Sequence, residues 1–295
     1  MAELRDRCIR FDWAIKRLLR QKANFDVLEG FLTVFLNEKV TIVDILESEG
    51  NHETAEDKFY RTYIKAKNNK DEIILIEIQN ITELYYLERV MDGITDVITE
   101  HIHLGNSYQE VKKVYSISIL YFDLGKGADY LYVGQNDFVG VHTKDNLIIT
   151  EKEEGAIVQR MPSEIFPTYY LVRVNNFNDV AKSPLEEWMR YLKEGIINED
   201  TKAPGLREAR QKLQYYSMSD ADRHAYDEHV NAVMIQNDVL GSAKLEGLEQ
   251  GRLEGRAEGR KEGIKETARK MKEQGLDTEM ICTVTGLSTD EIKSL

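Results

Sequence analysis

A glutamate and a glutamine lie two residues apart in a strongly apolar stretch, and they are the residues best placed for chemistry. They end the run Ile73-Ile74-Leu75-Ile76-Glu77-Ile78-Gln79. Residues i and i+2 of a β-strand point to the same face, so Glu77 and Gln79 would share one face of a strand. Carboxylate and amide oxygens bind hard divalent cations, and such a cation can activate water for phosphodiester cleavage. The pair therefore indicates a candidate site for metal-assisted hydrolysis.

A simpler interpretation of Glu77 stays open. A carboxylate on a buried strand requires a partner, a metal or an exposed strand end. A lysine paired with Glu77, or a helix end that Glu77 caps, would meet this requirement without catalysis. Whether Glu77 binds a metal or only a structural partner depends on the strands and helices that surround its side chain.

The residues around the pair predict a β-hairpin. Alternation over 61–67 predicts one strand, and the sequence Asn-Asn-Lys-Asp at 68–71 is typical of a turn. The stretch 72–79 is apolar and β-branched, which predicts a strand buried on both faces. A hairpin that turns at 68–71 places residue 62 or 63 opposite Glu77.

The elements on either side of this hairpin predict an α/β or α+β core. Helical periodicity covers 11–36, a strand is expected at 40–46, and 47–57 is an acidic polar loop. A helix over 82–102 would bury one side, and further strands are expected at 114–122, 129–133 and 138–142. The residues on that helix side are Leu84, Leu87, Met91, Ile94, Val97 and Ile98. A leading helix followed by strand, strand, helix and strand predicts a mixed sheet flanked by helices.

The C-terminal part of the chain is predicted to be helical, and we divide the chain into four regions. These are a core domain at 1–177, a helical extension at 178–240, a repeat at 241–266 and a small helical cap at 267–295. The extension starts a helix at Ser183-Pro184 and has a loop at 203–205. In the cap, Gly275 would end a first helix, and Ser288 to Glu291 form a capping box. The turn at 285–288 also resembles part of a helix-turn-helix, but a plain cap is the favoured interpretation.

Glycine recurs every fourth residue in the repeat. Five glycines, at 247, 251, 255, 259 and 263, would cost a helix on the order of 5 kcal/mol relative to alanine. Along a helix they form one stripe that permits close approach of a partner helix, so self-association through this tail is one hypothesis. A flexible charged linker is the other.

Composition restricts the partners and the compartment. The net charge of −13 opposes phosphate binding, so DNA contact requires a local basic patch. The first turns supply one, with Arg5, Arg7, Arg10, Lys16, Arg17, Arg20 and Lys22, although a solvated helix face would look the same.

The same charges interrupt any signal peptide, and the apolar runs are too short to cross a membrane. Cys8 and Cys282 form no disulfide framework or zinc motif, so we expect a cytoplasmic protein.

Three segments of the chain resemble the PD-(D/E)XK nuclease family transposases, including the Rpn group of recombination-promoting nucleases. They are FDWAIKRLL with NFDVLEGFL at 11–32, DKFYRTYIKAKNNKDEIILIEIQN at 57–80, and VYSISILYFDLGKGADYLYVG at 114–134. The resemblance extends over about residues 8–265 and includes the Glu-Gly tail. It implies a restriction-endonuclease-like core, Mg²⁺-dependent cleavage of DNA and a role in recombination or transposition.

The resemblance also implies a set of site residues. The family's acidic residue on the first helix carries over as Asp12, with Lys16 one turn later, and the family's Glu-x-Gln carries over as Glu77 and Gln79. Glu77 and Asp12 would hold the metal, and Gln79 would position water or phosphate. Lys16 would bind substrate, together with Tyr86 and Arg89 on the following helix.

One position departs from the family pattern. Counted back from Glu77, the family's aspartate falls on Tyr63. A phenol with a pKa near 10 is a poor ligand for a hard cation beside a carboxylate, so the site loses one charge and one oxygen donor. We therefore expect impaired nuclease activity. Asp44 on the preceding predicted strand is the residue that could supply the missing carboxylate. The alternative function is a catalytically inactive descendant that binds DNA or protein as an oligomeric module.

Overall fold

The computed structural model describes residues 8–46, 61–101, 112–153, 156–178 and 180–295. The chain divides into two compact units, Met1–Val233 and Met234–Leu295. The loop expected at 47–57 and the side chains of Arg5 and Arg7 lie outside the described residues.

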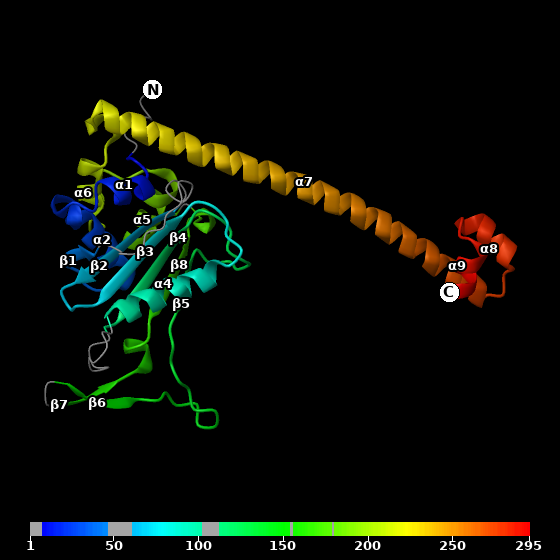
Figure 1. The fold of residues 1–295 in the computed structure, drawn as a ribbon, viewed down its shortest axis with the longest axis horizontal. Helices are drawn as coiled ribbons and strands as arrows, with labels where there is room; N and C mark the ends of the chain where they lie inside the picture. Colours follow the sequence, from blue (N-terminus) through cyan, green and yellow to red (C-terminus); the bar gives the residue numbers. More distant parts are fainter. Residues whose placement is uncertain (1–7, 47–60, 102–111, 154–155, 179) are drawn as a thin grey trace. The chain divides into compact units, whose positions relative to one another are not determined.

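A six-stranded mixed sheet forms the centre of the first unit (Figure 1). Its order is β1-β2-β3-β4-β8-β5; β4 runs parallel to both β3 and β8, and the other neighbours are antiparallel. The strands are β1 (Ile42–Leu46), β2 (Arg61–Asn68), β3 (Ile73–Gln79), β4 (Val114–Leu120), β5 (Leu131–Gly134) and β8 (Thr168–Arg173). The expected α/β fold with a mixed sheet and flanking helices is confirmed.

Helices cover both faces of this sheet. One face carries α1 (Phe11–Arg17), α2 (Phe25–Leu36), α5 (Pro184–Glu194) and α6 (Leu206–Lys212). The other face carries α4 (Tyr86–His101). Every residue of β3 is buried, because Ile74, Ile76 and Ile78 join the first core while Ile73 and Leu75 pack against α4.

The turn between β2 and β3 fixes their register. The side-chain Oδ1 of Asn68 accepts hydrogen bonds from the backbone N–H of Lys70 and Glu72 at 3.0 and 2.9 Å. Asparagine favours turns through such local side-chain bonds. The resulting register pairs Tyr63 with Glu77, as the position of the turn predicts.

The predicted helix at 11–36 is two α-helices with a short connection. α1 ends at Arg17, a 3₁₀ turn follows at η1 (Lys22–Asn24), and α2 starts at Phe25. The Asn24 side chain donates a hydrogen bond to the carbonyl of Leu18 at 2.9 Å. This bond competes with helix continuation, which apolar periodicity does not reveal.

The buried side of α4 matches the prediction at Ile94, Val97 and Ile98 but differs from it in the first turns. Its core residues are Tyr86, Val90, Ile94 and Val97, whereas Leu84 is 90% exposed and Leu87 and Met91 are also exposed. The expectation for these three residues was wrong. The helix starts at Tyr86, and the aromatic ring rather than the leucines enters the core.

The expected strand at 138–142 is also absent from the described structure. Only an isolated bridge joins Val139 to Asn146. The following residues instead form a separate hairpin, β6 (Ile149–Glu153) with β7 (Ala156–Arg160), which extends away from the large sheet (Figure 1). Short 3₁₀ turns lie at η3 (Pro162–Glu164), η4 (Val174–Asn176) and η5 (Tyr215–Ser217).

Two helices of the extension pack into the same core as the sheet. α5 starts at the predicted place, because Ser183 and Glu186 form a capping box. The loop before α6 brings Gly205 against Gly30 of α2: a Cβ placed on Gly30 would lie 2.3 Å from the Cα of Gly205. This contact requires both residues to be glycine.

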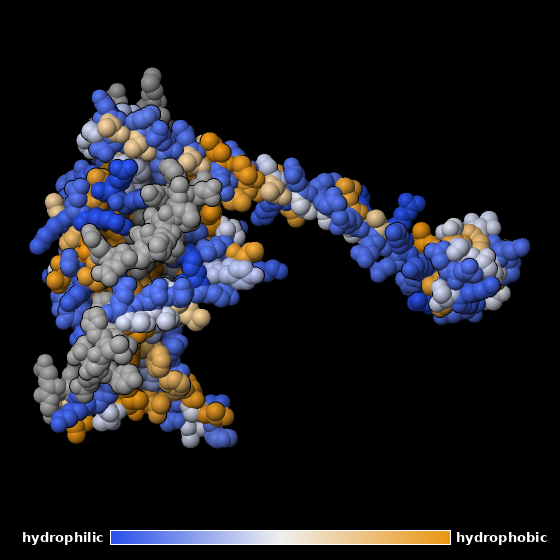
Figure 2. Space-filling view, viewed as in Figure 1, coloured by the Kyte–Doolittle hydropathy of each residue, from blue (hydrophilic) through white to orange (hydrophobic). Residues whose placement is uncertain are grey.

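The long helix α7 (Asp220–Glu273) contributes to both units, with its residues from Met234 onward in the second. The second unit continues with α8 (Thr278–Thr285) and α9 (Thr289–Ser294). Ala268, Ile281 and Ile292 form its small core, and the predicted capping box of Ser288 and Glu291 is present. Figure 2 shows apolar surface on α7, where the exposed apolar side chains include Met234, Ile235, Val239 and Leu240.

Candidate functional site

Glu77 and Gln79 lie together at the C-terminal end of β3, on the sheet face that α4 covers. Glu77 is 8% exposed and Gln79 is 4% exposed. They alternate with isoleucines that face the opposite core, so both polar side chains point toward α4. Glu77 is flanked in register by Tyr63 of β2 and Ser118 of β4.

Two residues of α4 bind the carboxylate of Glu77. Arg89 forms an ion pair with it through Nη1, and the Tyr86 hydroxyl donates to Oε2 at 3.4 Å. Arg89 also reaches Glu83 through Nε at 2.7 Å. Burial alone would lower the pKa of Arg89, but the charges of Glu77 and Glu83 outweigh burial and raise it. The predicted substrate residues Tyr86 and Arg89 thus converge on Glu77.

The site contains two buried polar atoms without hydrogen-bond partners among the described residues. They are Oε1 of Gln79, an acceptor, and Nη2 of Arg89, a donor. Buried polar atoms are usually satisfied, and each exception calls for a water, an ion or a ligand. The acceptor oxygen of Gln79 lies beside the Glu77 carboxylate and suits a cation. The donor nitrogen of Arg89 belongs to a guanidinium and suits an anion.

Asp12 lies on the other side of the sheet. Its fully buried carboxylate binds Arg10 at 3.0 Å, the Asn80 amide at 3.0 Å and His229 of α7 at 3.0 Å. Asn80 follows Gln79 and so occupies the face opposite to it. Burial would raise the pKa of Asp12, but Arg10 and His229 hold it well below its usual value. The structure does not bring Asp12 together with Glu77.

The basic N-terminal segment is only partly available for phosphate. Arg10 is committed to Asp12 and Asn80, whereas Arg17, Arg20 and Lys22 are exposed. Lys16 lies one turn after Asp12 on α1 and is half-buried. The exposed cations therefore lie between the end of α1 and the start of η1.

The oxygen donors near Glu77 fit a weakly held divalent cation. The described residues contain no cluster of three or more His, Cys, Asp or Glu side chains that could hold a metal. However, Mg²⁺ is commonly bound by one or two carboxylates together with water and substrate phosphate. Glu77 supplies one carboxylate, and the unsatisfied oxygen of Gln79 supplies a second donor on the same face. The cation site that the side-chain oxygens fit therefore consists of Glu77 and Gln79 and does not include Asp12.

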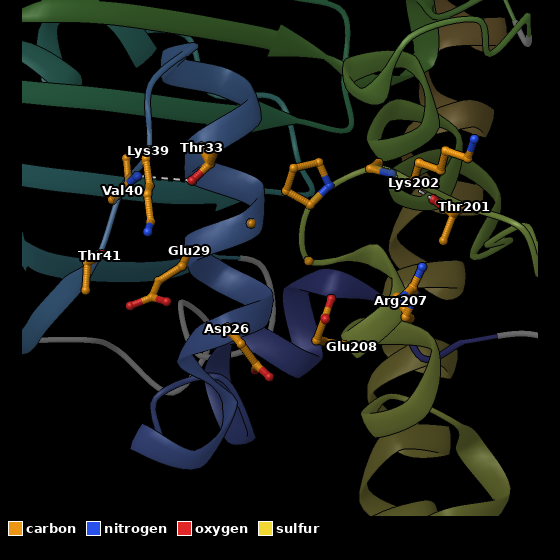
Figure 3. A pocket seen from close by; sticks show the side chains of 14 residues that line it. Asp26, Glu29, Thr33, Lys39, Val40, Thr41, Thr201, Lys202, Arg207 and Glu208 are labelled. Atoms are coloured by element: carbon orange, nitrogen blue, oxygen red, sulfur yellow. Dashed lines mark hydrogen bonds between the residues drawn. The ribbon is translucent and has the colours of Figure 1, made fainter.

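A separate groove lies between α2, the segment before β1 and the loop before α6 (Figure 3). Its lining mixes charges: Lys39, Lys202 and Arg207 with Asp26, Glu29 and Glu208. Thr33 and Glu29 use their side chains to accept the backbone N–H of Val40 and Ile42 at 3.1 and 2.8 Å. α2 and α6 pack on the sheet face opposite α4, so the groove does not coincide with the Glu77–Gln79 site.

Sequence reasoning missed three residues around these groups. Asn80 directly follows the strand predicted at 72–79, Ser118 lies inside the strand predicted at 114–122, and His229 lies in the helical extension predicted at 178–240. The register of β3 with β4 places Ser118 beside Glu77. His229 contacts a residue 217 positions away, and no local pattern predicts such a contact.

Among the described residues, no helix combines the length and apolar character needed to span a membrane. Neither cysteine forms a disulfide; the thiol of Cys8 is buried and that of Cys282 is partly exposed.

The hairpin, the Glu-x-Gln pair and the helix-covered mixed sheet define a nuclease-like α/β protein. A family model described as PD-(D/E)XK nuclease family transposase matches residues 9–243. The chain belongs to this family. No curated protein matches it, and no solved structure does so.

Proposed function

We propose that the protein binds DNA and cleaves its phosphodiester backbone with a divalent cation at Glu77 and Gln79, at a reduced rate. The observation that carries the proposal is the buried, unsatisfied Oε1 of Gln79 on the same strand face as the Glu77 carboxylate. The family to which the chain belongs supports a nuclease-like role with DNA as substrate. Recombination or transposition in the cytoplasm is the proposed setting.

Each residue near the pair has a proposed task. Glu77 and Gln79 would hold Mg²⁺, which when bound polarises the phosphate and activates water. Arg89 orients Glu77 and presents its unpartnered Nη2 to a phosphate oxygen. Tyr86 steadies the second carboxylate oxygen. Lys16 and the exposed cations after α1 would contact the DNA backbone, which requires positive charge.

Tyr63 is the proposed cause of reduced activity. The backbone register places it directly opposite Glu77, where an aspartate would add a second carboxylate to the cation site. With a tyrosine there, Glu77 is the one carboxylate that the described strands of this hairpin bring to the cation site, so the cation would be held weakly.

A plasmid assay tests this function. Purified full-length protein is incubated with supercoiled plasmid and Mg²⁺ or Mn²⁺. We expect little nicking by the wild type, a clear gain with Tyr63→Asp, and loss of that gain in Tyr63→Asp/Glu77→Ala. Nicking that survives Glu77→Ala would contradict the metal site, and no gain with Tyr63→Asp would contradict the explanation of reduced activity.

The alternative function is a non-catalytic module that oligomerises through its tail. The glycine repeat of α7 favours it, because a Cβ added at Gly251, Gly255 or Gly259 would meet no atom within 4 Å. Each four-residue repeat over 251–262 places an arginine one residue after the glycine and a glutamate three residues after it. At about 100° per residue, these charges flank the glycine stripe on opposite sides.

This charge pattern favours parallel pairing of two tails. In a parallel pair with a twofold axis along the helices, the arginine flank of one helix lies beside the glutamate flank of the other. In an antiparallel pair, like charges meet, which is unfavourable. Glycines four apart also allow the close helix approach known from small-residue motifs.

Co-purification tests the tail. Tagged and untagged full-length chains are mixed, and recovery of the untagged chain supports self-association. An Ala243→Cys/Cys282→Ser variant then reports direction. Ala243 lies four residues before Gly247 and continues the glycine stripe, so parallel tails bring both copies of residue 243 together and form a disulfide. Absence of co-purification would contradict pairing.

A further inference from the structure

A buried charged cluster outside the Glu77–Gln79 site joins three distant parts of the first unit. Asp12 comes from α1, Asn80 directly follows β3, and His229 comes from α7. The imidazole Nε2 of His229 lies 3.0 Å from Oδ2 of Asp12, and His229 is only 7% exposed. The proposed function leaves this histidine without a role.

Within the cluster, the amide of Asn80 is held at both ends. Arg10 Nη2 donates to Asn80 Oδ1 at 2.7 Å, and Asn80 Nδ2 donates to Asp12 Oδ2 at 3.0 Å. Arg10 Nη2 also donates to Asp12 Oδ2 at 3.0 Å, which closes a three-membered ring of contacts. The Asn80 side chain can rotate only if this ring opens.

The ring is connected to Gln79 through the backbone. Gln79 is the neighbour of Asn80, and its carbonyl accepts the N–H of Tyr121 at 3.0 Å. No side-chain hydrogen bond of the described residues holds Oε1 of Gln79. The direction of that oxygen therefore depends on how the backbone at 79–80 is fixed. On the strand side, pairing with Arg61 and Leu120 and the N–H of Tyr121 hold Gln79, and beyond the strand end the Asn80 side chain completes the anchor.

We propose that His229 is a positioning residue for the Glu77–Gln79 site. Its contact with Asp12 keeps the carboxylate locked onto Asn80, and Asn80 in turn sets the backbone from which Gln79 projects. The inference rests on the proposed function, because it concerns the cation ligands of that site. Residues behind metal ligands commonly change metal affinity by about 10- to 100-fold.

The packing of α7 on the start of α1 supports a specific contact between His229 and Asp12. One turn earlier, the Tyr226 hydroxyl accepts the backbone N–H of Arg10 at 3.1 Å, and its ring packs edge-on against Trp13 with centroids 5.6 Å apart. Tyr226 and His229 thus place one stripe of α7 on the start of α1. Because Tyr226 and Trp13 contribute packing, the polar contact of His229 is separable from the docking of the helix.

Mn²⁺ binding to the full-length protein, measured by calorimetry, tests the proposal. His229→Ala should weaken Mn²⁺ affinity about tenfold. His229→Gln, whose amide N–H can replace Nε2, should restore affinity to near the wild-type value. His224→Ala is the matched control on the same helix, since His224 is exposed and pairs only with Glu228 among the described residues; it should change nothing.

Two results would overturn the proposal: unchanged Mn²⁺ affinity in His229→Ala, or equal weakening in the alanine and glutamine variants, which would indicate a purely structural role. Wild-type protein that binds no Mn²⁺, or binds it equally well after Glu77→Ala, would instead overturn the proposed function. In that case amide hydrogen exchange decides the positioning claim. Faster exchange at residues 77–81 in His229→Ala than in His229→Gln supports it, and equal exchange contradicts it.

Discussion

The guanidinium of Arg89 and the carboxylate of Glu77 form an ion pair between α4 and β3, where both side chains are mostly buried. Removing one partner of a buried pair leaves an uncompensated charge, which costs about 3 kcal/mol or more. The pair therefore has a structural role in addition to any role in binding phosphate.

Arg89→Met should lower the free energy of unfolding by about 3 kcal/mol, measured by urea denaturation. The double variant Glu77→Gln/Arg89→Met should recover most of this loss, because it removes both charges and keeps similar side-chain volumes. If the double variant is as unstable as the single one, the ion pair does not explain the effect of Arg89.

The pH dependence of stability should report on Asp12. Its folded-state pKa lies below the usual value because Arg10 and His229 outweigh the effect of burial. A lowered folded pKa contributes stability that is present above the unfolded pKa near 4 and is lost as pH falls below it. Between about pH 4 and 2, the free energy of unfolding of the wild type should fall more steeply than that of Asp12→Asn, by about 1.4 kcal/mol per pH unit.

Urea titrations at several pH values measure this slope. Asp12→Asn will also change stability at neutral pH, so the comparison concerns the slope and not the absolute value. Two parallel curves would show that Asp12 is not held in its charged form by these partners.

The neighbourhood of Glu77 follows from local sequence rules, because a hairpin has few degrees of freedom. The Asn68 turn and the two-residue period of a strand together fix Tyr63 opposite Glu77. The same period places Glu77 and Gln79 on one face. This part of the site was predicted from the residues, and the structure confirms the register.

The position of Asp12 could not be derived in this way. The side of the sheet on which Asp12 lies is set by its contacts with Asn80 and His229, which are 68 and 217 positions away. Helical periodicity shows that α1 has a buried side but not which polar group enters it. Similarly, Leu84 and Met91 fit an apolar helix pattern, yet Tyr86 takes the core position, where its ring packs against Phe122 and its hydroxyl reaches Glu77.

DNA binding should depend on the cations at the end of α1. Arg17→Ala/Lys22→Ala removes two exposed charges, and each lost phosphate contact reduces the slope of log K against log salt by about 0.9. Fluorescence anisotropy with a labelled duplex at several salt concentrations measures the slope. The control Arg256→Ala/Arg260→Ala removes two exposed charges from the tail. If both double variants shift the slope equally, binding is not localised to α1.

Two glycines in helices should respond in opposite directions to alanine. Gly30 of α2 touches the backbone of the loop before α6, and a Cβ there would lie 2.3 Å from Gly205 Cα and 2.4 Å from the carbonyl carbon of Pro204. Because neither backbone atom can move without shifting the loop, Gly30→Ala should destabilise the protein by about 1–3 kcal/mol.

Gly255 of α7 has open space around its Cβ position. Gly255→Ala should therefore favour the helix by about 1 kcal/mol and raise the ellipticity at 222 nm during thermal unfolding. If two tails pair through the glycine stripe, the same substitution should also reduce co-purification of tagged and untagged chains, because a methyl group separates the helices. A variant that gains helix content and still pairs would show that the stripe is simply exposed, and that any association uses another surface of α7.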